Sequence, residues 1–414
     1  MSKLPQDLIV EIFSRLPVKP LIRFKCLSKT WRSMISDPEF AKLQLNRAKE
    51  NHNNFSCQKL LLSTWPPQSV DYEAFCDGNV RILSYPAIVK GPLDNFYVGI
   101  LGSCNGLVYL LDDYGSMFLW NPTTGDYTEL PNPNGAIYRM FRYGLGYNFS
   151  TDDYGVLFAS QFTANDSKET IVELYTLKTG AWRRIKEIDA VSQSYGGYGI
   201  FWNGALYWLE TKRSDLHQVY VIVAFDMVEE KFQEVLPLPD HFNSNCIVSL
   251  GASGNRLCIF CECRGTSFEA LVLNVNGIEA SLTRLFSFPH HKFPGYGNNA
   301  LCLTENGEVL MDCDGWEIYL YNPKQDNGYW HQYDQKAQLD DLSTVKQSQA
   351  MASKVLLLME LGPESAPFLL GVDLASHQSS SSILTSSDSS SPPILSLESN
   401  PPLFFFPSLH SPFP

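Results

Sequence analysis

The side chains best suited to chemistry in this sequence are three closely spaced cysteines, Cys258, Cys261 and Cys263. Cysteine pairs at short spacing are typical of tetrahedral zinc sites. The surrounding residues, however, predict a β-strand, on which side chains alternate between two faces. Cys261 and Cys263 would share one face and Cys258 the other, and no second Cys or His pair follows at zinc-finger spacing. We therefore predict core thiols and no metal site.

Other catalytic patterns in the sequence are incomplete. Gly144 and Gly146 begin a phosphate-loop pattern, but its third glycine is missing and no helical pattern follows. Residues 251–254 miss the spacing of a hydrolase nucleophile elbow by one position. His290-His291 precedes a proline in a predicted loop, which favours a solvated pair over a ligand site. The sequence therefore predicts no catalytic residue, no metal and no cofactor.

The strongest functional signal lies at the N-terminus, where residues 4–45 predict a compact helical unit. Apolar side chains recur there on one side of a first helix; they are Leu8, Ile9, Ile12, Phe13 and Leu16. A second helix is predicted from near Pro20 to Ile35, and Asp37-Pro38 predicts the start of a third. Such a unit is near the lower size limit for independent folding, so we expect its apolar surface to bind a partner.

The amino-acid sequence of this segment resembles that of a known family. LPQDLIVEIFSRLPVKPLIRFKCLSKTWRSMISDPEFAKLQL resembles the F-box of plant proteins, the adaptor-binding module of SCF ubiquitin ligases. The resemblance implies that eight residues face a Skp-family adaptor: Leu4, Pro5, Leu8, Ile12, Leu16, Pro17, Leu21 and Ile22. The alternative is an ordinary helical bundle that packs on its own domain.

Composition and charge narrow the class of protein. The chain has 414 residues, of which 44% are hydrophobic and 18% charged, so most of it should fold into two or three domains. Its net charge is −13, which argues against general nucleic-acid binding. Residues 1–50 hold ten Lys or Arg against five Asp or Glu, so this part is +5 and the remainder is −18. A basic F-box suits an acidic adaptor, although a solvated basic helix face explains the charge equally well.

The sequence also predicts the compartment. No signal peptide pattern and no apolar run of membrane-spanning length is visible, so no membrane contact is expected. The ten cysteines are then predicted to be reduced, buried thiols. We expect a cytoplasmic or nuclear protein, or one found in both compartments.

From about residue 55 the pattern changes to short strands separated by turn residues. Four Asn-Gly pairs predict tight hairpins: Asn105-Gly106, Asn203-Gly204, Asn276-Gly277 and Asn306-Gly307. A longer pattern of strand, polar turn and aromatic-led strand recurs about every 50 residues, the length of a four-stranded propeller blade. Its turns are marked by Gly125, Gly180, Glu230, Gly277 and Asp326. The aromatics after these turns are expected to pack between blades: Tyr127, Trp182, Phe232 and Trp330.

This region resembles the F-box-associated, kelch-like domain of plant proteins, including the S-locus type. The matching phrases are SCNGLVYL, LWNPTTGDYTELP, YGLGYNFSTDDYGVL, VELYTLKTGAWRRI and FWNGALYWL. The expected architecture is a three-helix F-box followed by a β-propeller of five to seven blades. The expected divisions are an F-box at 1–46, a linker and first β segment at 47–97, the kelch-like domain at 98–342 and a divergent tail at 343–414. The Ser- and Pro-rich end of that tail predicts disorder, and the last blade is expected to lack its closing strand.

Together these patterns predict a non-catalytic, substrate-recognition subunit of an SCF ubiquitin ligase. Its expected partners are a Skp-family adaptor, a cullin reached through that adaptor, and an unidentified target protein. The alternatives are a propeller enzyme and an F-box protein that acts as a binding module outside ligase complexes.

Two predicted loops, 133–143 and 288–297, mix aromatic and basic side chains and are candidates for target binding. Their candidate residues are Arg139, Phe141, Arg142, His290, His291 and Lys292. The alternatives are that both loops only link blades, and that the target binds the opposite rim or the loop at 240–246.

Overall fold

The computed structural model describes most of the chain up to residue 332 and one short segment beyond it. The described residues are 5–16, 18–37, 39–40, 43, 47, 58–62, 67–71, 80–86, 98–112, 114–134, 140–164, 167–185, 197–213, 218–242, 246–253, 256–263, 266–276, 279–289, 298–304, 306–313, 317–332 and 355–359. No helix among them is long and apolar enough to span a membrane.

Three short helices form the N-terminal unit: α1 (Gln6–Phe13), α2 (Val18–Leu27) and α3 (Lys29–Ile35). The single helix predicted from Pro20 to Ile35 is therefore wrong. Ser28 interrupts it with an extended backbone (φ −151°, ψ 138°) and occupies the position before α3 without a side-chain capping hydrogen bond. The predicted start of a further helix agrees with the structure, because Asp37 Oδ1 accepts the Glu39 amide at 2.9 Å and residues 39 and 40 are helical.

Consecutive strands form five blades in the described part of the chain. Blade 1 contains β4 (Gly99–Cys104), β5 (Leu107–Leu111), β6 (Met117–Trp120) and β7 (Tyr127–Leu130). Blade 2 contains β8 (Met140–Asn148), β9 (Asp153–Ala164), β10 (Ser167–Thr176) and β11 (Ala181–Arg184), with β12 (Gly197–Tyr198) parallel to β8. Blade 3 contains β13 (Ile200–Trp202), β14 (Ala205–Arg213), β15 (Gln218–Asp226) and β16 (Phe232–Pro237). Blade 4 contains β17 (Cys246–Ser253), β18 (Arg256–Cys263), β19 (Ser267–Asn276) and β20 (Glu279–Pro289). Blade 5 contains β21 (Asn298–Leu303), β22 (Val309–Cys313), β23 (Glu317–Asn322) and β24 (Asn327–Gln332).

A sixth sheet joins segments from both ends of the β region. It contains β1 (Gln58–Leu62), β2 (Gln68–Asp71), β3 (Val80–Ile82) and β25 (Val355–Met359), in the order β25-β1-β2-β3. We call it the composite sheet. Strand β25 pairs antiparallel with β1, with Leu357 opposite Leu60.

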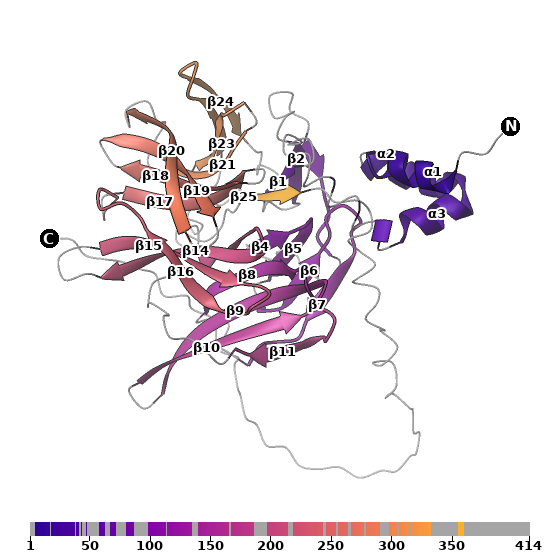
Figure 1. Cartoon of the computed structure of the whole chain (residues 1–414), viewed down its shortest axis with the longest axis horizontal. Helices are drawn as coiled ribbons and strands as arrows, with labels where there is room; N and C mark the ends of the chain where they lie inside the picture. Colours follow the sequence, from indigo (N-terminus) through magenta and orange to yellow (C-terminus); the bar gives the residue numbers. More distant parts are fainter. Residues whose placement is uncertain are drawn as a thin grey trace, which may run out of the picture.

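The ring of sheets is closed through the composite sheet (Figure 1). The first strands of successive blades contact one another in the order β4, β8, β13, β17 and β21, and β25 contacts both β21 and β4. The expectation that the closing strand is missing is therefore wrong. The sequence of β25, VLLLM, lies in a stretch that lacks the repeat pattern, so its role depends on pairing with β1 nearly 300 residues earlier.

The predicted 50-residue repeat is confirmed at the turns between the third and fourth strands of the blades. Four of its five markers have left-handed backbone: Gly125, Gly180, Glu230 and Asp326. In each turn the marker amide donates to the carbonyl four residues earlier, at 2.8–3.0 Å. Gly277 lies outside the described residues.

The predicted Asn-Gly hairpins are confirmed where both residues have positive φ. These are Asn105-Gly106 between β4 and β5, and Asn203-Gly204 between β13 and β14. Gly307 alone has positive φ in the longer β21–β22 turn, and Gly277 is not described.

Antiparallel order gives the ring two different rims. All the tight turns just described lie at one rim, which we call the turn rim. At the opposite rim, the loop rim, strands β7, β16 and β20 end and strands β8, β17 and β21 begin. The predicted target loops are shorter than expected, because residues 140–143 lie in β8 and residues 288–289 in β20. Cys246, at the end of the alternative loop, begins β17. The strands that flank all three connections end or begin at the loop rim.

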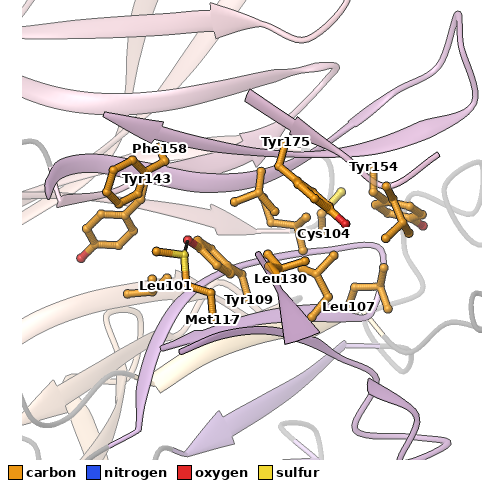
Figure 2. Close-up of a cluster of buried hydrophobic side chains, with 14 residues drawn as sticks. Leu101, Cys104, Leu107, Tyr109, Met117, Leu130, Tyr143, Tyr154, Phe158 and Tyr175 are labelled. Carbon is orange, nitrogen blue, oxygen red and sulfur yellow. Dashed lines mark hydrogen bonds between the residues drawn. The ribbon is translucent and has the colours of Figure 1, made fainter. Parts of the chain in front are cut away.

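Apolar side chains fill the spaces between blades, as the cluster between blades 1 and 2 shows (Figure 2). Trp182 packs on this cluster and Phe232 on the next, which confirms their predicted positions. Tyr127 is 39% exposed, so its predicted burial is wrong. The side chain of Trp330 lies outside the described residues.

Glycines allow neighbouring strands to approach closely near the ring centre. A Cβ on Gly251 of β17 would lie 2.1 Å from the carbonyl oxygen of Leu301 in β21. Gly144 and Gly146, the residues of the incomplete phosphate-loop pattern, lie within β8, and Cβ atoms there would meet Leu206 and Met227. These glycines serve packing between blades.

We predict that Gly251→Ala destabilises the propeller by about 3 kcal/mol or more, because the added methyl group would meet the backbone of Leu301. Gly180→Ala is the control: a Cβ there has no neighbour within 4 Å, and its φ of +66° gives a backbone cost of about 1–2 kcal/mol. Chemical denaturation of both variants measures the difference. Equal stability of Gly251→Ala and the unmodified chain would contradict the close approach of β17 and β21.

Candidate adaptor and target interfaces

The helical unit has a small aromatic core. Phe13 stacks on Phe24 with ring centroids 5.0 Å apart, and Trp31 meets both rings edge-on. Leu21 and Ile35 are fully buried beside them. These contacts involve all three helices and fix one face of α1 inward.

The opposite face of α1 leaves apolar surface exposed. Leu8 and Ile12, one helical turn apart, are 49% and 50% exposed. Leu27 at the end of α2 is 68% exposed, although it was not among the predicted adaptor residues. The sequence pattern placed Leu27 among the apolar residues of the second helix with Leu21 and Phe24, and the structure leaves it exposed. The structure thus agrees with the expectation that this unit has more apolar surface than it buries.

The eight predicted adaptor residues do not share one environment. Pro5 is exposed beside Leu8 and Ile12 at the start of α1. Leu16 is half-buried against the helical core, and Leu21 is fully buried within it. Leu21 is therefore a core residue, and the prediction that it faces a partner is corrected. Leu4, Pro17 and the side chain of Ile22 lie outside the described residues.

Ionic contacts hold α1 to the following segment. The Arg47 side chain donates to the Glu11 carbonyl oxygen at 3.1 Å and pairs with the Glu11 carboxylate. Arg15 pairs with the same carboxylate. These two guanidiniums hold the pKa of Glu11 below its ordinary value. Glu11 is next to Ile12, so the ion pairs of Glu11 with Arg15 and Arg47 help to fix the orientation of the exposed apolar side of α1.

Most predicted target residues fall outside the described part of the chain. Arg139, His290, His291 and Lys292 are in this group. The strands that flank them end or begin at the loop rim, as described above. Phe141 is half-buried and packs on the cluster between blades 2 and 3.

Arg142 is not available to a target. Its side chain is fully buried and forms an ion pair with the equally buried Glu210 of β14. The guanidinium also lies over the rings of Phe141 and Phe232, at 5.5 and 5.3 Å from their centroids. Burial lowers its pKa to about 10, which leaves it protonated at neutral pH. The prediction of Arg142 as a target contact is corrected: it joins blade 2 to blade 3.

The three clustered cysteines are core residues, as predicted. Cys261 and Cys263 lie in the cluster between blades 3 and 4, and Cys258 lies in the cluster on the other face of β18. Burial raises the pKa of Cys258 to about 12. Cys263, however, is disulfide-bonded to Cys246, so the expectation that all cysteines are reduced is wrong for this pair. Within the described residues, no group of three or more His, Cys, Asp or Glu could hold a metal ion.

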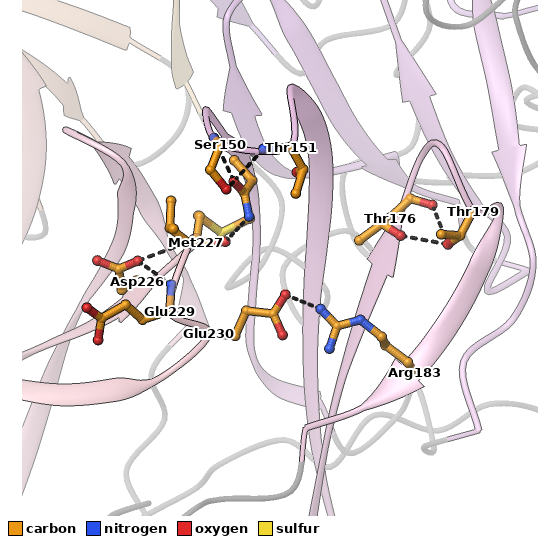
Figure 3. Close-up of polar contacts among 11 residues, drawn as sticks. Ser150, Thr151, Thr176, Thr179, Arg183, Asp226, Met227, Glu229 and Glu230 are labelled. Atoms are coloured by element: carbon orange, nitrogen blue, oxygen red, sulfur yellow. Dashed lines mark hydrogen bonds and ion pairs between the residues drawn. The ribbon is translucent and has the colours of Figure 1, made fainter.

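Polar contacts at the turn rim position turns of adjacent blades (Figure 3). Asp226 Oδ1 accepts the amides of Val228 and Glu229 at 2.7 and 2.8 Å. Arg183 of blade 2 pairs with Glu230 of blade 3. These side chains are used in turn formation and in blade contact.

Comparison with known proteins agrees with this arrangement. Residues 1–43 match the F-box domain family, and residues 80–349, more than half of the chain, match the F-box associated beta propeller domain. F-box protein CPR1 of Arabidopsis thaliana is 28% identical over 313 residues, which cover 69% of this chain and 73% of that protein. F-box/kelch-repeat protein At3g23880 of Arabidopsis thaliana is 30% identical over 298 residues, which cover 69% of this chain and 79% of that protein.

A three-helix unit with an exposed apolar face, followed by a β-propeller, defines an F-box protein of the propeller class. The chain belongs to the plant F-box proteins that carry an F-box associated beta-propeller domain.

We predict that Glu210→Ala destabilises the propeller by about 3–5 kcal/mol, because it leaves Arg142 buried without its carboxylate partner. The matched control is Glu234→Ala. Glu234 pairs with Lys212 on the same sheet, but both side chains are about 40% exposed, so the loss should stay below about 1 kcal/mol. Urea denaturation followed by tryptophan fluorescence compares the two variants. Similar losses would contradict a dominant role for the buried pair.

Proposed function

We propose that this chain is the substrate-recognition subunit of an SCF ubiquitin ligase. Its F-box binds a Skp-family adaptor, which is in turn bound to a cullin, and its propeller binds a target protein for ubiquitination and degradation. The observation that carries the proposal is the exposed apolar face of α1, where Leu8 and Ile12 are each about half exposed above a completed helical core. A monomeric unit gains nothing from this exposure, whereas burial of the exposed half of each side chain against a partner contributes roughly half of the ~1.5–3 kcal/mol of full burial.

In this proposal the chain performs no bond chemistry. The F-box and the propeller bring a target and the conjugating enzyme into one complex, which raises the effective concentration of target lysines near the reactive ubiquitin. The buried thiols and turn carboxylates described above have structural roles, which supports a non-catalytic subunit over a propeller enzyme. An F-box protein that acts outside ligase complexes would capture the adaptor without promoting ubiquitination, and a reconstituted ligase assay separates the two.

We further propose that the target binds at the loop rim. The three candidate connections, at 131–139, 238–245 and 290–297, all join strand ends on that side. The strands on either side are committed to packing between blades, so these connections are free to differ in sequence. The adaptor-facing residues proposed here are Pro5, Leu8 and Ile12, with Leu4, Leu16, Pro17 and Ile22 as further members from the family resemblance.

The adaptor interface is tested by Leu8→Asp and Ile12→Asp. Each places a carboxylate in an apolar contact, and each should weaken adaptor binding about tenfold or more. Thr30→Asp, at an exposed position on α3, is the matched control and should bind normally. Pulldown and titration with the purified adaptor measure the effect. Undiminished binding by both α1 variants would overturn the F-box assignment of this face.

The target interface is tested by Arg139→Ala and, separately, by a triple alanine variant at His290, His291 and Lys292. Both leave the buried Arg142 unchanged, and urea denaturation of each variant checks that the propeller stays folded. We expect weaker target capture with normal adaptor capture, measured by affinity capture from cells in which the proteasome is blocked. Phe149→Ala is the control, because Phe149 is 68% exposed at the turn rim. Target loss in that variant alone would move the interface to the turn rim.

A further inference from the structure

One pair of cysteines at the loop rim has no role in the function proposed above. Cys246 is the first residue of β17, Cys263 is the last residue of β18, and the two are directly opposite each other. Their Cα atoms are 4.1 Å apart and their sulfur atoms form a disulfide. The sequence alone gave no signal for this pairing, which follows from the register of β17 against β18.

The Cys246 sulfur has two contacts that exclude each other. It is bonded to the Cys263 sulfur, and it also lies 3.6 Å from the carbonyl oxygen of His241 with hydrogen-bond geometry. A thiol can donate a weak hydrogen bond to a carbonyl, but a disulfide sulfur carries no proton. The same backbone therefore accommodates two states: a dithiol in which Cys246 donates to His241, and a disulfide in which this donor is lost.

The contacts around Cys246 confine the difference between the dithiol and disulfide states to one turn, Pro239–Phe242. The Cys246 carbonyl oxygen accepts the Tyr220 hydroxyl at 2.9 Å, a bond that is independent of the state of the sulfur. Phe242 is fully buried, and its amide donates to the Pro239 carbonyl at 2.9 Å. His241 is exposed between these fixed points. Gain or loss of the thiol donor thus acts on the turn from Pro239 to Phe242.

Three other described cysteines of the propeller are less suited to reaction. Cys258, Cys261 and Cys302 are fully inaccessible, and burial raises the pKa of each thiol. A raised pKa leaves little thiolate, the form that attacks disulfides. Cys246 and Cys263 retain 5% and 8% exposure at the rim, so a small reagent reaches them first.

We propose that Cys246 and Cys263 form a reversible dithiol–disulfide site that exchanges with a low-molecular-weight disulfide such as oxidised glutathione. One protein thiolate attacks a glutathione sulfur, the glutathione S–S bond breaks, and one glutathione leaves as thiolate. The second protein thiolate then attacks the protein sulfur of the mixed disulfide and releases the other glutathione. The protein loses two electrons and two protons, and two reduced glutathione molecules receive them.

The state of this pair changes the hydrogen bonding of the Pro239–Phe242 turn. In the oxidised protein the His241 carbonyl loses its donor, while the ends of β17 and β18 become covalently joined. This turn belongs to the 238–245 connection of the loop rim, so a consequence for target binding rests on the proposed function. The dithiol–disulfide exchange itself does not.

The test uses the full chain equilibrated with oxidised or reduced glutathione, quenched with acid and alkylated with N-ethylmaleimide. Trypsin cleavage after Lys231, Arg256 and Arg264 separates Cys246 from Cys263, so their disulfide joins two peptides that fragmentation identifies. We expect the joined peptides with oxidised glutathione and their loss with excess reduced glutathione. Hydrogen exchange should be faster across 239–243 and slower at the ends of β17 and β18 in the oxidised protein.

Two variants sharpen this test. Cys263→Ser retains the Cys246 donor and cannot form the disulfide, so its hydrogen exchange should match the reduced protein under both conditions. Cys26→Ser removes an exposed cysteine of α2 and should behave as the unmodified chain. Absence of the joined peptides at every glutathione ratio, or their persistence in excess reduced glutathione, would overturn the proposal. So would identical exchange across 239–243 in both states, whereas a failed adaptor pulldown would affect only the proposed function.

Discussion

The propeller is stable only when the two ends of its ring are joined. Each blade buries its faces only against two neighbours, so an open ring leaves one face of its first and last sheets exposed to water. The two ends of the ring are joined by the antiparallel pairing of β25 with β1. This pairing places β25 between β21 and β4. The glycine contact between β17 and β21 and the buried Arg142–Glu210 pair keep neighbouring blades close at other junctions.

The closed ring separates two kinds of surface. At the turn rim, short turns use their own side chains to satisfy backbone groups, as Asp226 does, and this leaves little freedom for change. At the loop rim, longer connections join outer to inner strands without being needed for blade geometry. The F-box adds a third surface, an apolar helix face that is independent of either rim. The F-box surface and the rim surfaces can therefore change separately in such a chain.

Local patterns were sufficient to predict the helical unit, the strands and the repeat. Gly125 and Gly180 marked turns because a left-handed position favours glycine, and the equivalent Glu230 and Asp326 were recognised from spacing alone. The same reasoning failed where distant residues decide the outcome. An arginine between aromatic residues has the composition of a binding surface, and only the position of Glu210, 68 residues later, makes Arg142 an interior residue. Likewise, VLLLM was recognisable as apolar, but its partner β1 was not.

The origin of β25 near the far end of the described chain also has a consequence for synthesis. Nearly 300 residues separate β1 from the strand that pairs with its free edge, an interval of about 15–60 s at typical translation rates. During that time the F-box helices have already left the ribosome, while one edge of the composite sheet has no partner and is open to incorrect pairing. A nascent chain of this kind can expose its F-box helices before its propeller ring exists.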